Sequence, residues 1–497
     1  MITTRRTVLG GALLGVAGLT ARQSQAQARD AVTLGMALEP TALDPTTGAA
    51  QAIREVTLQN FYEGLVRIDR DGRIQPCLAE SWSIAPDGLT YTFRLRSPVT
   101  FHNGVILDSS HVKFTFERAK APDSTNAQKW IFDPIASIET PDPHTAVIKL
   151  SRPLANFLFG LGLGDAVIFE PSTVANNRNS PVGTGPYRFT RWVRGDRVEM
   201  ERYEQYRDRA NVAIRRAAFR FMSDAQAQMA ALRGGDIDGV TAFGAFEAVD
   251  LFRSDPRFKV TVGNTEGKTI VAMNNGKAPF TDVRVRRAMA HAIDRNAVIQ
   301  GAMSGFGTPI GSHFSPNQPG YVDLTGMYPY DPAKARQLLT EAGLPNGFAC
   351  TLRLPPPVYA RRGGEIVAAQ LAQVGVRATI EPIEFAQWLD QVFRRRDYDL
   401  TIISHTEPRD TEIYARDNYY YAYNNPEFRA LVERISTTID EDQRNRMYGE
   451  AQRILATDCV NVFLFMLPKI TIASANLRGM WDNWPLPANP IAELRWA

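Results

Sequence analysis

The chain has few of the residues that carry chemistry in enzymes and metalloproteins. Its 497 residues include three cysteines, Cys77, Cys350 and Cys459, which lie far apart, and six histidines. No CxxC or Cys/His metal spacing occurs, and no two histidines stand four residues apart as in a helical zinc motif. A G-x-S-x-G nucleophile elbow is also missing. We therefore predict no catalytic residue, no metal site and no cofactor, and expect a protein that is not an enzyme.

One glycine-rich segment, from Gly263 to Thr269, invites comparison with a phosphate-binding loop. Three residues separate Gly263 from Gly267, where the nucleotide-binding loop needs four. The residues from Thr269 onward are typical of a strand, whereas a helix should follow such a loop. The segment therefore predicts an ordinary turn leading into a strand.

The chain also lacks a second long hydrophobic run. The apolar stretch from Val8 to Leu19 is too short to span a bilayer stably. It follows Arg5-Arg6 and precedes Ala26-Gln27-Ala28, a small-x-small cleavage pattern. These features predict a signal peptide over residues 1–28, of twin-arginine type, with a Sec signal or a retained anchor as alternatives. No cysteine lies near the cleavage point, so a lipoprotein anchor is not expected.

The small positive charge belongs to that N-terminal segment. Residues 1–28 contain Arg5, Arg6 and Arg22 and no acid. Their removal leaves 53 basic and 53 acidic residues. A neutral protein gives no support for a nucleic-acid partner. If the protein is exported, the cysteines could form one disulfide and leave one thiol, or remain three buried free thiols.

The length predicts two or three domains, and strand-like and helix-like segments alternate as in mixed α/β folds. Signals for helix starts and ends predict five helices, over 284–299, 332–342, 365–374, 426–435 and 441–456. Six further segments have the short apolar pattern of strands, at 145–150, 197–202, 269–273, 379–383, 400–404 and 462–466.

The segment 78–118 is the most distinctive part of the sequence. Residues 90–96 alternate between apolar and polar, which predicts a half-buried strand, and Asp108 provides an N-cap for a following helix. The order of these elements resembles the signature region of the family 5 extracellular solute-binding proteins. Four further segments are similar to family blocks: Pro181 to Tyr187, Val285 to Arg295, Tyr330 to Gly343 and Asp440 to Cys459.

The resemblance implies an α/β, two-lobed periplasmic-binding-protein-like (type II) fold with an extra subdomain. It assigns 31–66, 181–264 and 470–497 to the first lobe, 67–180 to the extra subdomain and 265–469 to the second lobe. It also implies a monomeric periplasmic receptor that captures a peptide or similar small solute between the lobes and delivers it to ABC transporter permease subunits. Receptors for nickel or metal chelates, or for opines or oligosaccharides, remain alternatives, and an exported hydrolase is a remote one.

In the family, ligand contacts come mainly from loops that face the cleft. The loop after the strand 400–404 offers Asp410 or Glu407 as the anion for a ligand ammonium group. This loop has His405 and Arg409 where peptide-binding members commonly have Trp and an Asp-rich run, and His405 motivates the metal-chelate alternative. An arginine such as Arg361 could hold a carboxylate. The remaining candidates are aromatic, namely Tyr359, Trp388, Tyr414 and Tyr420.

Overall fold

The computed structural model describes residues 29–48 and 50–497. The predicted signal peptide over residues 1–28 lies outside these residues. Within them, no helix is both long and apolar enough to cross a membrane. All three cysteines are free and buried, which agrees with the interpretation as three buried thiols.

A large mixed sheet runs through the described part of the molecule. On one side of this sheet the strands come from the second half of the chain, and on the other side they come from the first half. In spatial order its strands are β15 (Arg377–Pro382), β14 (Ala349–Leu354), β16 (Leu400–His405), β12 (Phe258–Met273), β17 (Asn461–Ser474), β11 (Gly239–Val240), β1 (Ala31–Met36), β10 (Arg216–Phe221), β9 (Arg197–Arg202) and β8 (Tyr187–Val193), with β13 (Thr308–Pro309) paired to β17.

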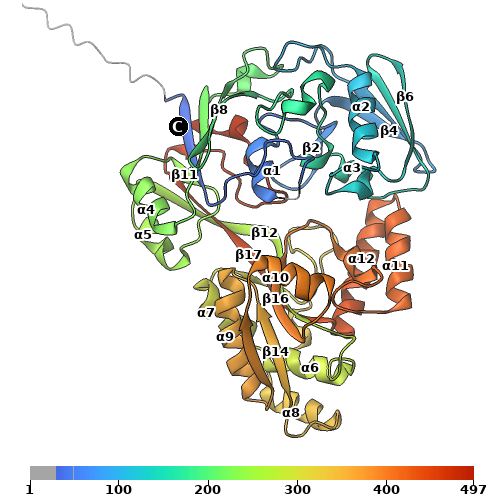
Figure 1. Ribbon diagram of the computed structural model, residues 1–497, viewed down its shortest axis with the longest axis vertical. Helices are drawn as coiled ribbons and strands as arrows, with labels where there is room; N and C mark the ends of the chain where they lie inside the picture. Colours follow the sequence, from blue (N-terminus) through green and yellow to red (C-terminus); the bar gives the residue numbers. More distant parts are fainter. Residues whose placement is uncertain (1–28, 49) are drawn as a thin grey trace, which may run out of the picture.

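Two long antiparallel strands, β12 and β17, connect the two halves of this sheet (Figure 1). Their outer parts pair from Phe258 to Asn264 beside β11, and their inner parts from Lys268 to Ala272 beside β16. The register shifts between Asn264 and Lys268. Such an irregularity bends and twists a strand pair. We call this point, where both strands pass from one half of the sheet to the other, the hinge.

The glycine-rich segment 263–269 therefore forms no turn before a strand. It lies inside β12 and contains the register shift. The prediction of a turn was wrong because the cross-strand partner β17 keeps this segment extended, which local sequence cannot show. The proposed lobe boundaries at 264/265 and 469/470 fall within the two connecting strands.

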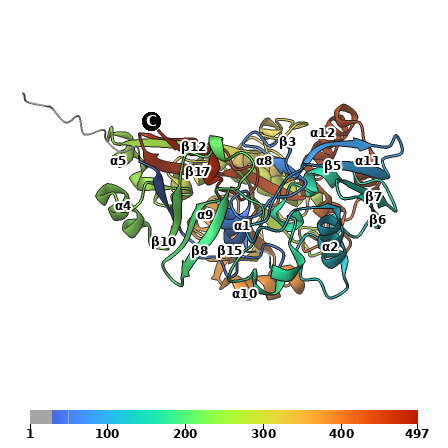
Figure 2. The ribbon, with the colours of Figure 1, turned by 90° about the horizontal axis from the view of Figure 1, so that it is seen from above.

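A second sheet of four strands builds a separate unit with its own core. Its spatial order is β4 (Ala79–Ile84), β5 (Thr90–Leu95), β7 (Thr145–Leu150) and β6 (Ile135–Asp142). Helix α2 (Ser109–Lys120) packs against it, and Asp108 caps this helix as predicted, in a capping box completed by His111. Figure 2 shows this unit at the opposite end of the molecule from α4 and α5. The order strand, turn and capped helix predicted for 78–118 is confirmed.

The other helices are α1 (Gln51–Thr57), α3 (Phe157–Gly160), α4 (Ala225–Gly234), α5 (Val249–Arg253), α6 (Val283–Ala292), α7 (Arg295–Met303), α8 (Pro332–Glu341), α9 (Val358–Ala372), α10 (Phe385–Trp388), α11 (Pro426–Thr437) and α12 (Glu441–Thr457). Most of them pack around the large sheet, whereas α3 belongs to the four-stranded unit, where its Phe157 packs against Tyr91. Short strand pairs are formed by β2 (Val66–Ile68) with β3 (Ile74–Pro76) and by β18 (Leu477–Arg478) with β19 (Arg495–Trp496).

Three of the five predicted helices begin at the expected caps, namely α8, α11 and α12. The single helix expected over 284–299 is two helices, because Asp294 accepts hydrogen bonds from the backbone N–H groups of Asn296 and Ala297 and so caps a new helix. Helix α9 starts earlier than predicted, at Val358, because Gly363 and Gly364 pack closely against Val298 and Leu354.

The four-stranded unit also contacts the second half of the chain away from the hinge. The backbone N–H of Ala155 donates to the carbonyl of Ser436 over 2.8 Å, and the Asn156 side-chain amide donates to the Tyr448 hydroxyl over 3.2 Å. Figure 1 shows α11 and α12 beneath this unit, close to α3. The space enclosed between the hinge and this second contact contains the candidate site.

Candidate functional site

Two adjoining cavities lie between the two halves of the molecule. The small cavity has a volume of about 430 Å³ and the large cavity about 910 Å³. Both are lined by Gln128 and Leu163 from the first part of the chain and by Thr406, Glu407 and Pro408 from the second. The shared residues show that the cavities are two compartments of one cleft, of a combined size suited to a small solute.

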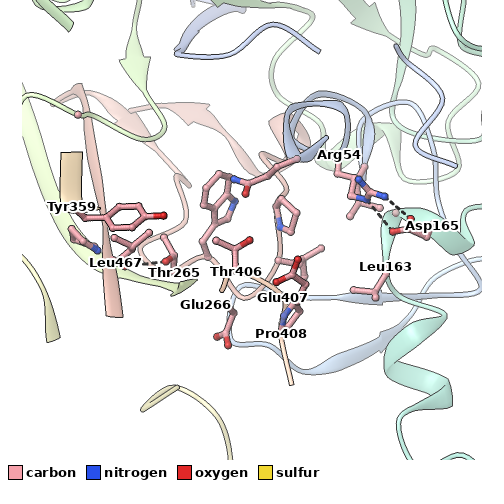
Figure 3. Close-up of a pocket in the computed structure, with 18 of the residues that line it drawn as sticks. Arg54, Leu163, Asp165, Thr265, Glu266, Tyr359, Thr406, Glu407, Pro408 and Leu467 are labelled. Carbon is pink, nitrogen blue, oxygen red and sulfur yellow. Dashed lines mark hydrogen bonds and ion pairs between the residues drawn. The ribbon is translucent and has the colours of Figure 1, made fainter. Parts of the chain in front are cut away.

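The residues 406–411, which we call the β16 loop, separate the two compartments. Strand β16 is buried and pairs with β12 up to His405, opposite Lys268. The loop therefore leaves the sheet beside the hinge. Figure 3 shows Thr406, Glu407 and Pro408 of this loop between Tyr359 and the Arg54–Asp165 pair in the small cavity.

The first-lobe wall of the small cavity carries a buried ion pair. Arg54 on α1 binds both carboxylate oxygens of Asp165, and its guanidinium also donates to the carbonyls of Pro45 and Gly48. Because these partners use its donors, Arg54 is a structural support. Trp484 completes this wall and offers a flat apolar face to a ligand.

The opposite wall of the small cavity carries two acids, Glu266 and Glu407. Glu407 is exposed to the cleft. Glu266 is buried, and burial raises the pKa of its carboxyl group to about 7, against the lowering effect of Lys268. Its Oε2 accepts a hydrogen bond of 2.5 Å from Gln318. These carboxylates suit a ligand ammonium group, which would restore a counter-charge to Glu266.

Asp410 is present at the cleft but its charge is already neutralised. Lys268 Nζ lies 2.7 Å from its Oδ1, and the His313 ring nitrogen Nε2 lies 3.2 Å from the carboxylate. Despite its burial, Lys268 and then His313 hold the pKa of Asp410 well below its usual range. Lys268 also donates to the Glu407 carbonyl over 2.6 Å. The pair therefore fixes the β16 loop, and the expected role of Asp410 as a free anion for a ligand is not supported.

His405 belongs to the same buried network. Its Nε2 lies 2.8 Å from the Tyr420 hydroxyl and 2.6 Å from the Tyr421 hydroxyl. Burial, aided by neighbouring cationic groups, lowers the pKa of His405 to about 3, so the ring is neutral at physiological pH. On the far side, the Tyr414 hydroxyl lies 3.0 Å from His313 Nδ1 and accepts from Asn461 over 3.0 Å.

His313, His405 and Asp410 are the described groups that come close enough to hold a metal ion, with ligand atoms within 4.8 Å of one another. Two histidines and a carboxylate are a common ligand set for divalent transition metals. Here the Lys268 ammonium contacts the carboxylate, and tyrosine hydroxyls contact the imidazole nitrogens. The cluster is therefore best explained as an internally satisfied network that contains its own cation.

The structure places five of the eight predicted site residues at the cleft. Tyr359 lines the small cavity, Glu407 lines both, and Trp388, His405 and Asp410 line the large one. Tyr359 also accepts a hydrogen bond of 3.2 Å from the Ser404 backbone N–H, and Trp388 donates to Thr401 over 2.9 Å. These contacts hold both aromatic rings in place.

The structure does not place the other three predicted residues, Arg361, Tyr414 and Tyr420, on the lining of either cavity. Arg361 lines neither cavity, because its guanidinium donates to the carbonyls of Pro355 and Ile383 and joins β14 to β15. Tyr414 and Tyr420 are 2 % and 1 % exposed and form the core beneath the loop. Aromatic residues next to a ligand loop have the same sequence signature whether they support the loop or face the cleft.

Sequence reasoning missed residues on both walls of the small cavity. Arg54, Asp165 and Trp484 come from segments with no binding motif. Thr265 and Glu266 lie in the glycine-rich segment that the sequence predicts to be an ordinary turn. An acid between two glycines, in a strand that changes register, is a signal that could have identified Glu266.

Comparison with known proteins agrees with this arrangement. The family model described as "Bacterial extracellular solute-binding proteins, family 5 Middle" matches residues 73–427. The chain belongs to this family. Family 5 proteins are binding receptors of the bacterial periplasm that serve ABC importers, so the cleft between the lobes is a solute-binding cleft.

Curated relatives cover nearly the whole chain. The glutathione-binding protein GsiB of Salmonella paratyphi A is 28% identical over 491 residues, covering 95% of this chain and 95% of that protein. The glutathione-binding protein GsiB of Pectobacterium atrosepticum is 29% identical over 475 residues, covering 91% and 92%.

Solved structures share the family 5 fold. The PBP AgaA from A. tumefaciens R10, in complex with agropinic acid, matches with a TM-score of 0.78 and 24% identity over 94% of this chain and 99% of that chain. DppA from Helicobacter pylori, in complex with the peptide STSA, matches with a TM-score of 0.79 and 24% identity over 94% and 98%. At this identity the likeness shows the two-lobed α/β fold.

Proposed function

We propose that this family 5 protein captures a small peptide or a similar amphiphilic solute and delivers it to the permease of an ABC importer. The observation that carries the proposal is the pair of joined cavities, lined by both lobes and crossed by a hinge of two strands. A ligand that contacts both walls would favour the closed arrangement of the lobes, which is how a hinged receptor signals occupancy.

The chemistry of the cleft supports a peptide-like solute. Glu266 and Glu407 offer carboxylates to an ammonium group, and Tyr359 and Trp484 offer apolar faces with polar edges. The curated relatives named above are called glutathione-binding proteins, and glutathione is itself a modified tripeptide. The predicted twin-arginine signal over residues 1–28 and a monomeric state remain parts of the same proposal.

The decisive measurement is a thermal-shift screen of the mature protein with peptides, glutathione, opines, metal chelates and sugars. A true ligand binds the folded state alone and should add about 2.7 kcal/mol to the free energy of unfolding at one hundred times its Kd. Trp fluorescence should change too, because Trp484 lines the small cavity and Trp130 and Trp388 line the large one. The absence of any ligand, combined with turnover of an ester or glycoside, would overturn the proposal in favour of a hydrolase.

Binding of a free-amine peptide should depend on pH through Glu266. The Glu266 carboxyl group has a pKa raised to about 7, so it is neutral at pH 5.5 and increasingly charged as pH rises. A peptide ammonium binds the charged form, so affinity for the tripeptide Ala-Ala-Phe should increase roughly tenfold between pH 5.5 and pH 7. Above pH 7 the peptide amine itself begins to lose its proton.

Titration calorimetry at several pH values tests this expectation. The Glu266→Gln variant should lose the pH dependence, because an amide cannot titrate, and N-acetyl-Ala-Ala-Phe should bind the native protein with little dependence on pH. An unchanged pH profile in Glu266→Gln would show that Glu266 does not control ammonium binding.

A further inference from the structure

Arg409, at the centre of the β16 loop, is a cation without an acidic partner in the large cavity. Its guanidinium lies over the Phe159 ring, 4.3 Å from the ring centre, and donates one long hydrogen bond of 3.4 Å to Asn156 Oδ1. Among the described residues, no carboxylate oxygen lies within 4.0 Å of it. Burial in this position lowers the pKa of Arg409 from its ordinary value. A guanidinium that has left water without a counter-ion is costly unless something else neutralises it.

The backbone at this residue is also unusual. Arg409 has φ of 58°, in the left-handed region that L-residues other than asparagine and aspartate rarely adopt. Strained backbone at a ligand loop is common where the strain directs a side chain into a site. Here the left-handed backbone and a partly buried charge occur at one residue that lines the cavity.

The other charges of the large cavity leave Arg409 available. Arg416 pairs with Glu412 over 3.0 Å, and Asp410 is paired with Lys268. Lys129 and Arg152 add positive charge to the lining of the large cavity, and the exposed acids Glu407 and Glu433 add negative charge.

A second polar group without a partner lines the same cavity. Thr411, two residues after Arg409, is 2 % exposed, and its hydroxyl has no hydrogen-bond partner within the part of the chain that the structure describes. A buried hydroxyl is almost always hydrogen-bonded in a completed structure. Thr411 therefore marks a polar group in the β16 loop that the described residues leave unsatisfied.

The rest of the large cavity is aromatic. Phe385 and Trp388 stack with ring centres 5.8 Å apart, and Trp388 and Phe393 stack at 6.2 Å. Phe385 and Phe393 are 47 % and 39 % exposed although they line the cavity. Apolar rings that face an open cavity, with cationic side chains at its wall, suit a solute that carries an anionic group next to a planar or apolar group.

We propose that the large cavity binds a carboxylate of the transported solute, with Arg409 as the residue that selects for it and the aromatic residues holding the adjoining apolar group. This inference rests on the proposed function, because it places the carboxylate end of the ligand at Arg409 while the proposed function places the ammonium end at Glu266. It predicts that a solute bearing both charges spans the two compartments across the β16 loop.

Titration calorimetry with Ala-Ala-Phe and with its C-terminal amide tests the inference. The native protein should bind the free acid roughly 30-fold more tightly than the amide, because a charge-assisted pair in a closed cleft is strong. Arg409→Met should remove this preference, and Arg409→Lys, which keeps the charge but loses the planar fork, should restore part of it. Arginine, methionine and lysine are all unbranched at Cβ, so the substitutions should leave the left-handed backbone at this position unchanged.

The controls separate binding from structure. Arg188→Met removes a cation that lines neither cavity and has a carboxylate partner, Glu201, over 2.6 Å, so its acid-to-amide ratio should equal that of the native protein. If Arg409 only braced the two lobes, Arg409→Met would weaken acid and amide equally, and the inference would be wrong. Equal binding of acid and amide by the native protein would overturn it without any variant. No binding of either peptide would instead count against the peptide proposal itself and remove the support for this inference with it.

Discussion

Lys268→Met should lower the free energy of unfolding by about 3–5 kcal/mol, because it leaves the buried Asp410 carboxylate without its main counter-charge. The side chains of Lys268 and Asp410 are 2 % and 6 % exposed, with Nζ and Oδ1 2.7 Å apart. The same ammonium donates to the Glu407 carbonyl, so its loss also frees the β16 loop from the sheet. Urea denaturation followed by circular dichroism measures the change.

A matched surface pair provides the control. Lys277 contacts Asp399 over 2.6 Å, but its side chain is 51 % exposed. Exposed pairs contribute about 0–1 kcal/mol, so Lys277→Met should be nearly neutral. The double variant Lys268→Met with Asp410→Leu should recover much of the lost stability, since both members of the buried ion pair are then apolar. Similar small losses in both single variants would show that the Lys268–Asp410 pair does not hold the loop.

Gly183→Ala should destabilise the protein by about 2–4 kcal/mol, at the upper end of overpacking effects. A Cβ atom at this position would lie 2.1 Å from the carbonyl oxygen of Phe61 and 2.7 Å from the Tyr62 ring. Phe61 and Tyr62 are completely buried, and a backbone carbonyl cannot rotate away as a flexible side chain can. The segment from 181 to 187 would have to separate from α1 and the residues that follow it. The midpoint of urea denaturation measures this loss.

Gly326→Ala is the comparison for this test. No atom lies within 4 Å of the Cβ that would be added there, and the residue is exposed. Its substitution should leave the denaturation midpoint within experimental error of the native value. Equal effects of the two substitutions would contradict the close approach of the two backbones at Gly183.

The two stability predictions show different limits of sequence reasoning. Gly183 lies in a block that resembles a family motif, so its importance is visible in the sequence, but the reason is a contact with Phe61 across more than 100 residues. The Lys268–Asp410 pair has no sequence signature. Glycines and helix caps reflect the local conformation of the backbone, which a short stretch of sequence can reveal. A buried ion pair depends instead on how distant segments of the chain come together.

The predicted site residues that line the cleft are mostly those at or just after the end of a strand that reaches it. His405 ends β16, Glu407 and Asp410 follow it, and Tyr359 lies at the start of α9 after β14. Arg361 lies one helical half-turn beyond Tyr359 and turns away to bond the ends of two strands. A difference of two residues decides which face of a helix a side chain occupies, and sequence does not say which face lies toward the cleft.

The sequence by itself determined the family, the mixed α/β class, three of the capped helices and the loop that borders the cleft. These follow from local rules, because caps, strand alternation and motif order act over a few residues. Only the tertiary structure decided which charges are available to a ligand. Asp410 is neutralised by Lys268 from another strand, while Arg409 has no acidic partner. Removal from water makes a charge without a partner costly, so this difference in pairing affects which group is available to a ligand.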